Sequence, residues 1–362
     1  MRNTTPSVGQ EAARIFEFFC SRGARPFDTD VLQPATSLLD LYGEDIRSRA
    51  FVTEGAMRDE LMLRPDFTVP LAKFHMESAS ESAGYAYSGQ VFRVQRPGSG
   101  RPCEFPQVGF ELFGGDDPAQ ADAEIFSAFC EILKPCDLSI ATGDLRLLTT
   151  AVEGLAATEG QKAALKRHLW RPERFRQLLE KFSEKPDDGR QKEQLESEIE
   201  QNCRAAGIVI GQRRLSEVVE NVLSQIHENR APALPVEQLD SLDQLLDVKG
   251  DMQDSLLRLR QVAMDFPGIE KALDGIEQRM DALSRRGVAA DDLRFEASFG
   301  RTRMEYYDGF VFGFFQGGEE QPVALGGRFD FLTEALGKGR TCPAVGGMIR
   351  PDLTLQCRQE AG

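Results

Sequence analysis

The segment FRVQRPGSGRPCEFPQVGFE, residues 92–111, decides the fold. It opens on an expected strand with basic residues, turns through Gly, Pro and Ser, and ends on an expected strand that carries Gln107 and Glu111. These two residues are four apart, so they face the same side of a strand. Because buried polar groups are costly without hydrogen-bond partners, the pair favours a pocket for a nucleotide or an amino acid. The loop between the strands is equally consistent with a solvent-exposed hairpin tip.

The composition is typical of a soluble cytoplasmic protein with more than one domain. The chain has 362 residues, of which 41% are hydrophobic, and its formal net charge of -15 disfavours nucleic-acid binding as the main activity. The seven cysteines form no CxxC pair and the three histidines lie far apart, so we expect reduced thiols, no metal site and no cofactor. We also expect no membrane span and no signal peptide, because long apolar runs are missing.

The first 150 residues read as helices alternating with short strands. Apolar residues at helical spacing predict a helix over 8–22 and another over 119–135. Residues 50–74 predict a hairpin followed by a short helix from Thr68. Three further strands are expected over 31–34, 84–97 and 102–114, and a second helical stretch is expected after Pro34.

The middle of the chain has a different texture. Residues 153–239 are highly charged and helical in pattern, which predicts a solvated helical insertion, and the helical pattern continues to about 286. LRFEASF (293–299) and MEYYDGFVFGFFQ (304–316) then read as a hairpin pair. A Gly-Gly turn at 326–327, a helix over 329–337 and a strand over 344–349 complete the expected elements.

This order of elements predicts an α+β fold that an insertion interrupts. Strands from the two ends of the chain are expected to join one antiparallel sheet flanked by helices. The expected parts are residues 1–152, the helical insertion 153–240, and residues 241–362.

In this order, the segments resemble the catalytic core of class II histidyl-tRNA synthetases. VLQPATSLLDLYG (31–43) is similar to the dimer-forming first motif, LRPDFT (63–68) to the LRPEGT loop, and residues 92–111 to the second motif. MEYYDGFVF and ALGGRFDFL resemble the two histidine-specific segments, and PAVGG (343–347) resembles the approach to the third motif. The resemblance covers most of residues 8–150 and 240–355 and implies the class II synthetase fold.

The chain departs from that family where ATP and tRNA would bind. The family carries an anticodon-binding domain after the third motif, whereas this chain ends at Gly362, so we expect no tRNA partner. The position of the catalytic arginine falls on Thr302, although Arg301 and Arg303 stand beside it. Fixed guanidinium groups stabilise charge that develops at phosphorus, so their loss predicts that adenylation is lost as well.

Three further motif positions differ. In the third motif, Asp352 and Leu353 occupy the positions of the family's glutamate and arginine. In the second motif, Gln95 replaces a glutamate and Cys103 replaces an arginine of the loop. These replacements all fall on the half of the site that the resemblance assigns to ATP.

The half that the resemblance assigns to the amino acid is largely kept. Asp66, Thr68 and Gln107 match positions that hold the amino group of histidine in the synthetase. Glu111 and Tyr307 match positions that reach the imidazole ring, which needs a hydrogen-bond donor and an acceptor. For Asp66, an ordinary loop carboxylate is the alternative.

Three more residues bear on the expected pocket. Arg93 stands at the motif arginine and is expected to meet a carboxylate. Tyr306 and Tyr307 are expected to alternate faces of a strand, so that only one of them enters the pocket. Phe329 replaces a tyrosine of the family, which removes one hydroxyl.

This combination is similar to the regulatory subunit of short-form ATP phosphoribosyltransferase. The resemblance implies a non-catalytic cytoplasmic chain that forms a homodimer within a hetero-octamer. It implies that the catalytic subunit needs this chain for activity, and that L-histidine binds the complex and inhibits the first step of histidine biosynthesis. The resemblance leaves open whether histidine binds in the pocket described above or at the subunit contact.

Two other functions remain open at this level. One is a truncated histidine-activating ligase that uses Arg301 or Arg303 as a displaced catalytic arginine. The other is a stand-alone histidine-binding dimer without an enzyme partner. A fold shared by all three does not distinguish them, because function depends on the site.

Overall fold

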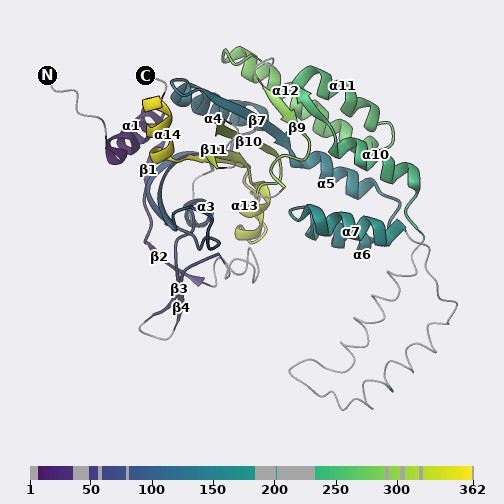
Figure 1. Ribbon diagram of the computed structural model, residues 1–362, viewed down its shortest axis with the longest axis horizontal. Coiled ribbons are helices and arrows are strands. Elements are labelled where there is room, and N and C mark those ends of the chain that lie inside the picture. Colours follow the sequence, from purple (N-terminus) through teal and green to yellow (C-terminus); the bar gives the residue numbers. More distant parts are fainter. Residues whose placement is uncertain are drawn as a thin grey trace.

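A nine-stranded mixed sheet forms the centre of the described structure (Figure 1). The computed structural model describes residues 7–35, 49–55, 59–78, 81–183, 201, 233–289, 293–301, 306–317 and 321–360. The strand order is β1-β5-β6-β12-β11-β10-β7-β9-β8. In that order the strands are Arg25–Phe27, Ala83–Phe92, Glu104–Phe113, Ala344–Ile349, Pro322–Arg328, Phe310–Gln316, Leu138–Asp144, Arg294–Glu296 and Lys249–Asp251.

The sheet joins the two ends of the chain, as expected from the sequence. β12 lies between β6 and β11 and pairs with both in antiparallel fashion, with Gly346 opposite Glu111. β5 and β6 pair along their whole length, from Ala83 opposite Phe113 to Phe92 opposite Glu104, which confirms the predicted strand pair. Strands β1 and β5 pair in parallel, and so do β7 and β9, so the sheet is mixed rather than purely antiparallel.

Long helices cover one face of the sheet (Figure 1). α1 begins with a capping box in which Ser7 and Gln10 each accept from the other's backbone, and α4 begins with Asp117 accepting from the Gln120 backbone. Phe126 and Phe129 of α4 pack against the phenylalanines of β10 in one core. These helices are α1 (Val8–Ser21), α4 (Pro118–Leu133), α12 (Glu270–Arg285) and α14 (Pro351–Glu360).

The other face carries α3 (Thr68–Glu77) and α13 (Asp330–Leu336), which contact each other, and a small second sheet. That sheet has the order β2-β4-β3, from Leu32–Pro34, Glu60–Leu63 and Val52–Glu54. The predicted strand before Pro34, the hairpin and the helix from Thr68 are therefore confirmed. The helical stretch predicted after Pro34 lies outside the described residues.

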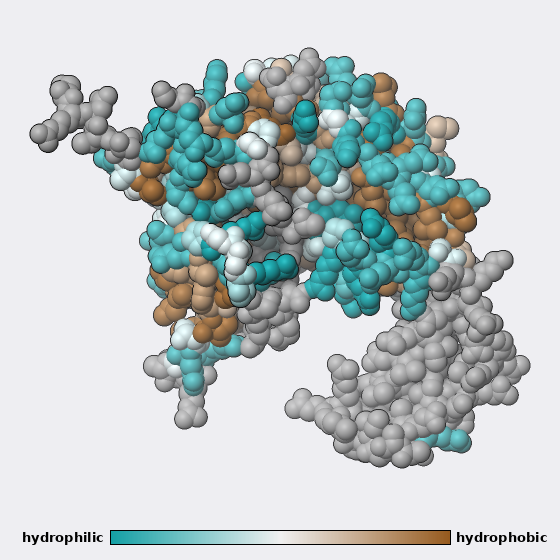
Figure 2. Space-filling view, in the orientation of Figure 1, coloured by the Kyte–Doolittle hydropathy of each residue, from teal (hydrophilic) through white to brown (hydrophobic). Residues whose placement is uncertain are grey.

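The small sheet exposes an apolar surface. Figure 2 shows hydrophobic colour at the lower left, where Figure 1 places β2 and β3. Val31, Leu32, Phe51 and Val52 each expose more than a third of their area there.

A separate helical core lies beside the sheet. It packs apolar residues from Leu147 to Phe182 of the first helices against those from Leu242 to Ile276 of the later ones, and Phe295 of β9 joins them. The described parts of the predicted insertion 153–240 are helical, whereas residues 184–200 and 202–232 lie outside the description. The core continues past both ends of that insertion, whose boundaries stay a prediction. The helices are α5 (Leu145–Gly154), α6 (Glu159–Arg167), α7 (Pro172–Ser183), α10 (Val236–Leu246), α11 (Met252–Val262) and α12.

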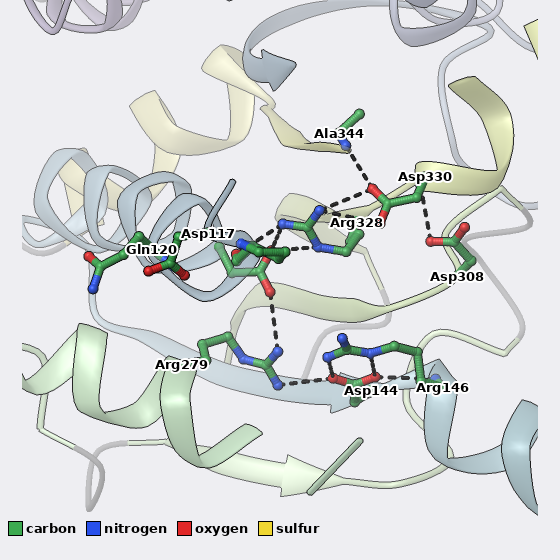
Figure 3. A network of polar contacts seen from close by, with 11 residues as sticks. Asp117, Gln120, Asp144, Arg146, Arg279, Asp308, Arg328, Asp330 and Ala344 are labelled. Carbon is green, nitrogen blue, oxygen red and sulfur yellow. Dashed lines mark hydrogen bonds and ion pairs between the residues drawn. The ribbon is translucent and has the colours of Figure 1, made fainter. Parts of the chain in front are cut away.

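A buried network of arginines and aspartates connects the sheet to its helices (Figure 3). Arg328 of β11 donates twice to Asp122 of α4, at 3.0 and 2.6 Å, and to both carboxylate oxygens of Asp330, at 3.0 and 3.4 Å. Arg279 of α12 joins Asp122 to Asp144, the last residue of β7, at 3.2 and 3.1 Å. Burial alone would raise the pKa of Asp144, but its arginine neighbours lower the pKa to about 2.

Three predicted features of the C-terminal third are wrong. LRFEASF and MEYYDGFVFGFFQ do not form a hairpin, because β7 lies between β9 and β10 and pairs with both. The strand of the second segment begins at Phe310, after the two tyrosines. Gly326 and Gly327 lie inside β11 rather than in a turn. Glycine is needed at 326 because a Cβ atom there would lie 2.2 Å from the Phe312 ring.

Candidate functional site

Gln107 and Glu111 lie on β6 and are each only 1% exposed. The alternation of the strand puts both on the face that carries α3, as predicted. Gly109 lies between them, and a Cβ there would come within 2.1 Å of the Tyr87 ring. The glycine therefore lets Tyr87 of β5 lie against β6 between the two polar residues.

Glu111 is only half satisfied by hydrogen bonds. Its Oε1 accepts from Thr68 Oγ1 at 2.7 Å and from the Tyr87 hydroxyl at 3.3 Å. Its Oε2, and both polar atoms of the Gln107 side chain, are buried and have no hydrogen-bond partner among the described residues. Buried polar groups in folded proteins nearly always have partners, so these three atoms make this the candidate ligand site.

Asp66 and Thr68 approach Glu111 from the start of α3. Thr68 is the first residue of that helix, and Asp66 Oδ1 accepts from the Val69 backbone at 3.3 Å, within the first turn. Both side chains are buried. Asp66 thus brings a second carboxyl group to the cluster, close enough to raise the pKa of Glu111.

Tyr306 and Tyr307 both reach the cluster of Asp66, Thr68 and Glu111. The rings of Tyr306 and Tyr307 are 4.6 Å apart, and both pKa values are raised, first by burial. Tyr306 interacts with Thr68 and Tyr307, and Glu111 acts on both rings. The prediction that only one tyrosine enters the pocket is wrong, because the two precede the strand and do not follow its alternation.

The remaining predicted residue, Arg93, lies at the edge of the cluster. Its Nε donates to the Pro65 carbonyl at 2.8 Å, and its charge acts on Asp66. Phe329 is fully buried and presents its edge to Tyr306 and Tyr307, at 6.3 and 6.2 Å between ring centroids. The position where the related family has a hydroxyl is therefore part of an apolar wall here.

Burial raises the pKa of both carboxyl groups in this pocket. It raises the pKa of Glu111 to about 8, although the hydrogen bond from Thr68 opposes the shift. Burial also raises the pKa of Asp66, against the charge of Arg93. A cationic group placed beside these two carboxyl groups would stabilise their ionised forms.

Next to this pocket, an arginine-lined cleft of about 230 Å³ contains Arg49, Arg93, Arg101 and Arg350. Arg350 donates to both oxygens of Asp352, at 2.9 and 2.6 Å, and its guanidinium lies 4.2 Å from the centre of the Phe105 ring. The predicted departure at Asp352 therefore has a structural role, since its carboxylate pairs with an arginine of the same chain.

The Arg301 side chain contacts the helical part of the protein rather than the cluster around Glu111. Its Nε donates to the Leu169 carbonyl at 2.9 Å, and its guanidinium lies 4.9 Å from the centre of the Phe175 ring, both in the helical part. Thr302 and Arg303, the other residues of that motif, lie outside the described residues.

Tyr87 is the pocket residue that the sequence reasoning missed. Its hydroxyl donates to Glu111, and its ring stacks on the ring of Phe67 with 4.5 Å between centroids. The Tyr87 side chain therefore lines the pocket between Gln107 and Glu111. The sequence contained a signal for it, because the YAY pattern over 85–87 alternates on the strand opposite Gln107 and Glu111.

Within the described ranges, no three His, Cys, Asp or Glu side chains group closely enough to hold a metal ion. No helix in the described part of the chain combines the length and apolarity needed to cross a membrane.

Sequence relatives match this chain over most of its length. Residues 10–196 and 213–352 match the family described as histidyl-tRNA synthetase. The ATP phosphoribosyltransferase regulatory subunit of Allorhizobium ampelinum is 31% identical, with 92% of this chain and 94% of that protein covered. The protein of the same name from a Chelativorans species is also 31% identical, with 96% and 97% covered.

This chain belongs to the ATP phosphoribosyltransferase regulatory subunit family. Solved structures agree at the level of the fold. A Bacillus halodurans structure described as an ATP phosphoribosyltransferase regulatory subunit/histidyl-tRNA synthetase gives a TM-score of 0.68 at 20% identity, over 99% of this chain and 81% of that one. A Nostoc histidyl-tRNA synthetase gives 0.63 at 19% identity, over 100% and 76%. The class II synthetase-like α+β fold expected from the sequence is therefore confirmed for this family member.

Proposed function

We propose that this chain is a non-catalytic regulatory subunit that the catalytic subunit of short-form ATP phosphoribosyltransferase needs for activity. In this proposal, L-histidine binds the pocket on β6 and inhibits the first step of its own biosynthesis. The names of the relatives support the regulatory role. The pocket supports the identity of the ligand.

One observation carries the ligand proposal. Gln107 and Glu111 present three buried polar atoms without partners in the described structure, next to the carboxyl group of Asp66. Free histidine supplies an ammonium group for carboxylates and a ring with one donor and one acceptor. The tyrosines and Phe329 add aromatic walls that suit an imidazole.

Three observations favour this proposal over a truncated ligase. Arg350 is paired with Asp352, and Arg301 is held by the helical part rather than by the cluster around Glu111. Position 353, which matches an arginine of the synthetase, is a leucine. A ligase needs free guanidinium groups around a phosphate, and losing one such donor typically costs about a hundredfold or more in rate. We therefore expect no histidine-dependent exchange of pyrophosphate into ATP.

We also propose that the chain acts as a homodimer within a hetero-octamer, without tRNA and in the cytoplasm. The exposed apolar side chains of the small sheet support a dimer contact, because Val31 and Leu32 fall in the segment that resembles the dimer-forming motif. Such exposed patches commonly mark protein contacts.

Replacing Gln107 with leucine tests the pocket. The variant Gln107→Leu should bind histidine at least about tenfold more weakly, because two hydrogen-bonding atoms are lost. The free protein should keep or gain stability, since leucine removes a buried amide without partners. Isothermal titration calorimetry and urea unfolding measure the two effects.

Gln90→Leu is the matched control, because Gln90 lies on the neighbouring strand with an exposed side chain. It should bind histidine like the unmodified protein. Equal histidine affinity in all three proteins would remove the pocket from the proposal and place histidine at the subunit contact. Binding without any effect on the transferase would favour the stand-alone histidine-binding dimer.

A further inference from the structure

A second cleft, of about 480 Å³, lies between the helical part and the sheet. Its walls come from the start of α7, the end of α10, the turn after β9, and strands β10 and β11. Pockets of this size hold small organic molecules. The described structure places it apart from the Gln107–Glu111 pocket, and the two share no lining residue.

Arg301 gives this cleft its chemistry. The side chain is 5% exposed, and its Nη2 is buried without a hydrogen-bond partner among the described residues. The two contacts that described residues make with its guanidinium, the Leu169 carbonyl and the Phe175 ring, carry no negative charge. A buried cation without an anion is costly, so it is expected only where a ligand or partner supplies the missing charge.

A second arginine reinforces the positive charge. Arg176 lines the same cleft and is held only loosely, 3.8 Å from the exposed carboxylate of Glu173. Burial, together with the charge of Arg176, lowers the pKa of Arg301 to about 10. The first turn of α7 also lines the cleft through Pro172, and the positive end of a helix favours anions.

The other walls define the shape of the ligand. Phe299 and Phe315 meet edge to face at 6.1 Å, and Leu325 lies beside them, so the cleft has an apolar side. Of its two carboxylates, Glu296 accepts from Ser298 at 2.7 Å, and Asp247 is exposed. Neither is within ion-pair distance of Arg301 in the described part of the chain.

We infer that this cleft binds a small organic oxyanion, a carboxylate or a phosphate ester with an apolar portion, through Arg301 and Arg176. The anion completes the hydrogen bonds of Arg301 and links α7 to the sheet. The inference is independent of the histidine pocket, because it rests on different residues.

The single tryptophan of the chain offers a local probe. Trp170 follows Leu169, whose carbonyl accepts from Arg301, and it packs against both the helical core and the core of the α3 face. Titrating inorganic phosphate in one series and benzoate in another should produce a saturable change in its fluorescence in at least one series. The responding series tells whether the site prefers a phosphate or a carboxylate.

Variants assign the response to the cleft. Arg301→Met and Arg176→Gln should each weaken anion binding by about tenfold or more, since hydrogen bonds to charged groups are lost. Arg301→Lys keeps the charge without the planar fork and should give an intermediate loss. Without anion, Arg301→Met should be at least as stable as the unmodified protein, which separates lost binding from failed folding.

Two controls complete the test. Arg174→Gln removes the same charge from an exposed position of the same helix and should leave binding unchanged. Arg101→Gln removes an arginine of the other cleft and should leave the fluorescence change intact. The inference is overturned if neither anion gives a saturable change, or if Arg301→Met responds as the unmodified protein does.

Discussion

Replacing Arg328 with methionine should lower the free energy of unfolding by about 3–5 kcal/mol, the range typical of a broken buried ion pair. The guanidinium makes two hydrogen bonds to Asp122 and one to the Pro118 carbonyl, and the side chains of Arg328 and Asp122 are both buried in the network of Figure 3. Methionine fills a similar volume but leaves Asp122 with Arg279 as its arginine partner among the described residues. The loss therefore comes from a buried carboxylate that keeps one of two arginine partners, rather than from a cavity.

Urea unfolding followed by circular dichroism measures this loss. Arg286→Met is the matched control, because Arg286 also pairs with a carboxylate of α4, Glu124, but at 3.6 Å and with both partners partly exposed. That surface pair should contribute less than about 1 kcal/mol. Similar losses in both variants would mean that the buried network adds no more than an ordinary surface contact.

Glu111→Gln should remove the contribution of Glu111 to the pH dependence of stability. That contribution amounts to about 3–4 kcal/mol in the free energy of unfolding between pH 5 and pH 8. In the unfolded chain Glu111 titrates near 4.5, whereas in the folded protein burial raises its pKa to about 8. The folded state therefore binds the proton more tightly. Its contribution is complete below pH 4.5 and is lost as the pH rises through about 8.

The difference between the two proteins isolates this residue. Asp308, whose pKa burial and Asp330 raise to about 7, changes stability in the same direction in both proteins. Glutamine keeps an acceptor for Thr68 but does not ionise, so the variant should gain stability relative to the unmodified protein as the pH rises. Glu104→Gln, at an exposed position of the same strand, should follow the unmodified protein. Parallel curves for Glu111→Gln and the unmodified protein would show that Glu111 is already ionised in the fold.

Local patterns were sufficient for the elements that carry the pocket. The strand pair around residues 92–111, the helix that begins at Thr68, and the shared face of Gln107 and Glu111 all follow from spacing and turn residues. The resemblance to the synthetase added which carboxylates meet there. Asp66, Thr68, Glu111, Tyr306 and Tyr307 do lie together, although a role in binding histidine is still a proposal.

Long-range pairing was beyond the reach of these patterns. The pattern of LRFEASF correctly predicts a strand. No local pattern indicates that β7, which lies far earlier in the chain, pairs between this strand and β10. Gly326 and Gly327 read as a turn because glycine usually marks one. In the fold they are strand residues: the missing side chain of Gly326 leaves room for the ring of Phe312, and that of Gly327 for the Phe310 carbonyl and the ring of Tyr307.

The raised pKa of Glu111 was also hidden in the sequence. A glutamate four residues after a glutamine suggests a polar ligand, but its raised pKa depends on burial that only the packed structure provides. The same holds for Arg301, which one alternative, the truncated ligase, takes together with Arg303 as a candidate displaced catalytic arginine. The Arg301 side chain is oriented by contacts with Leu169 and Phe175, and the sequence alone does not predict these contacts.

Reconstitution of the transferase tests the central claim most directly. Phosphoribosyl-ATP formation would be measured with the short catalytic subunit of the same organism, with and without this chain, across a histidine titration. The account predicts that the chain switches activity on, that histidine switches it off, and that Gln107→Leu still activates but needs at least about tenfold more histidine for inhibition. A catalytic subunit that is equally active with and without this chain would contradict the account.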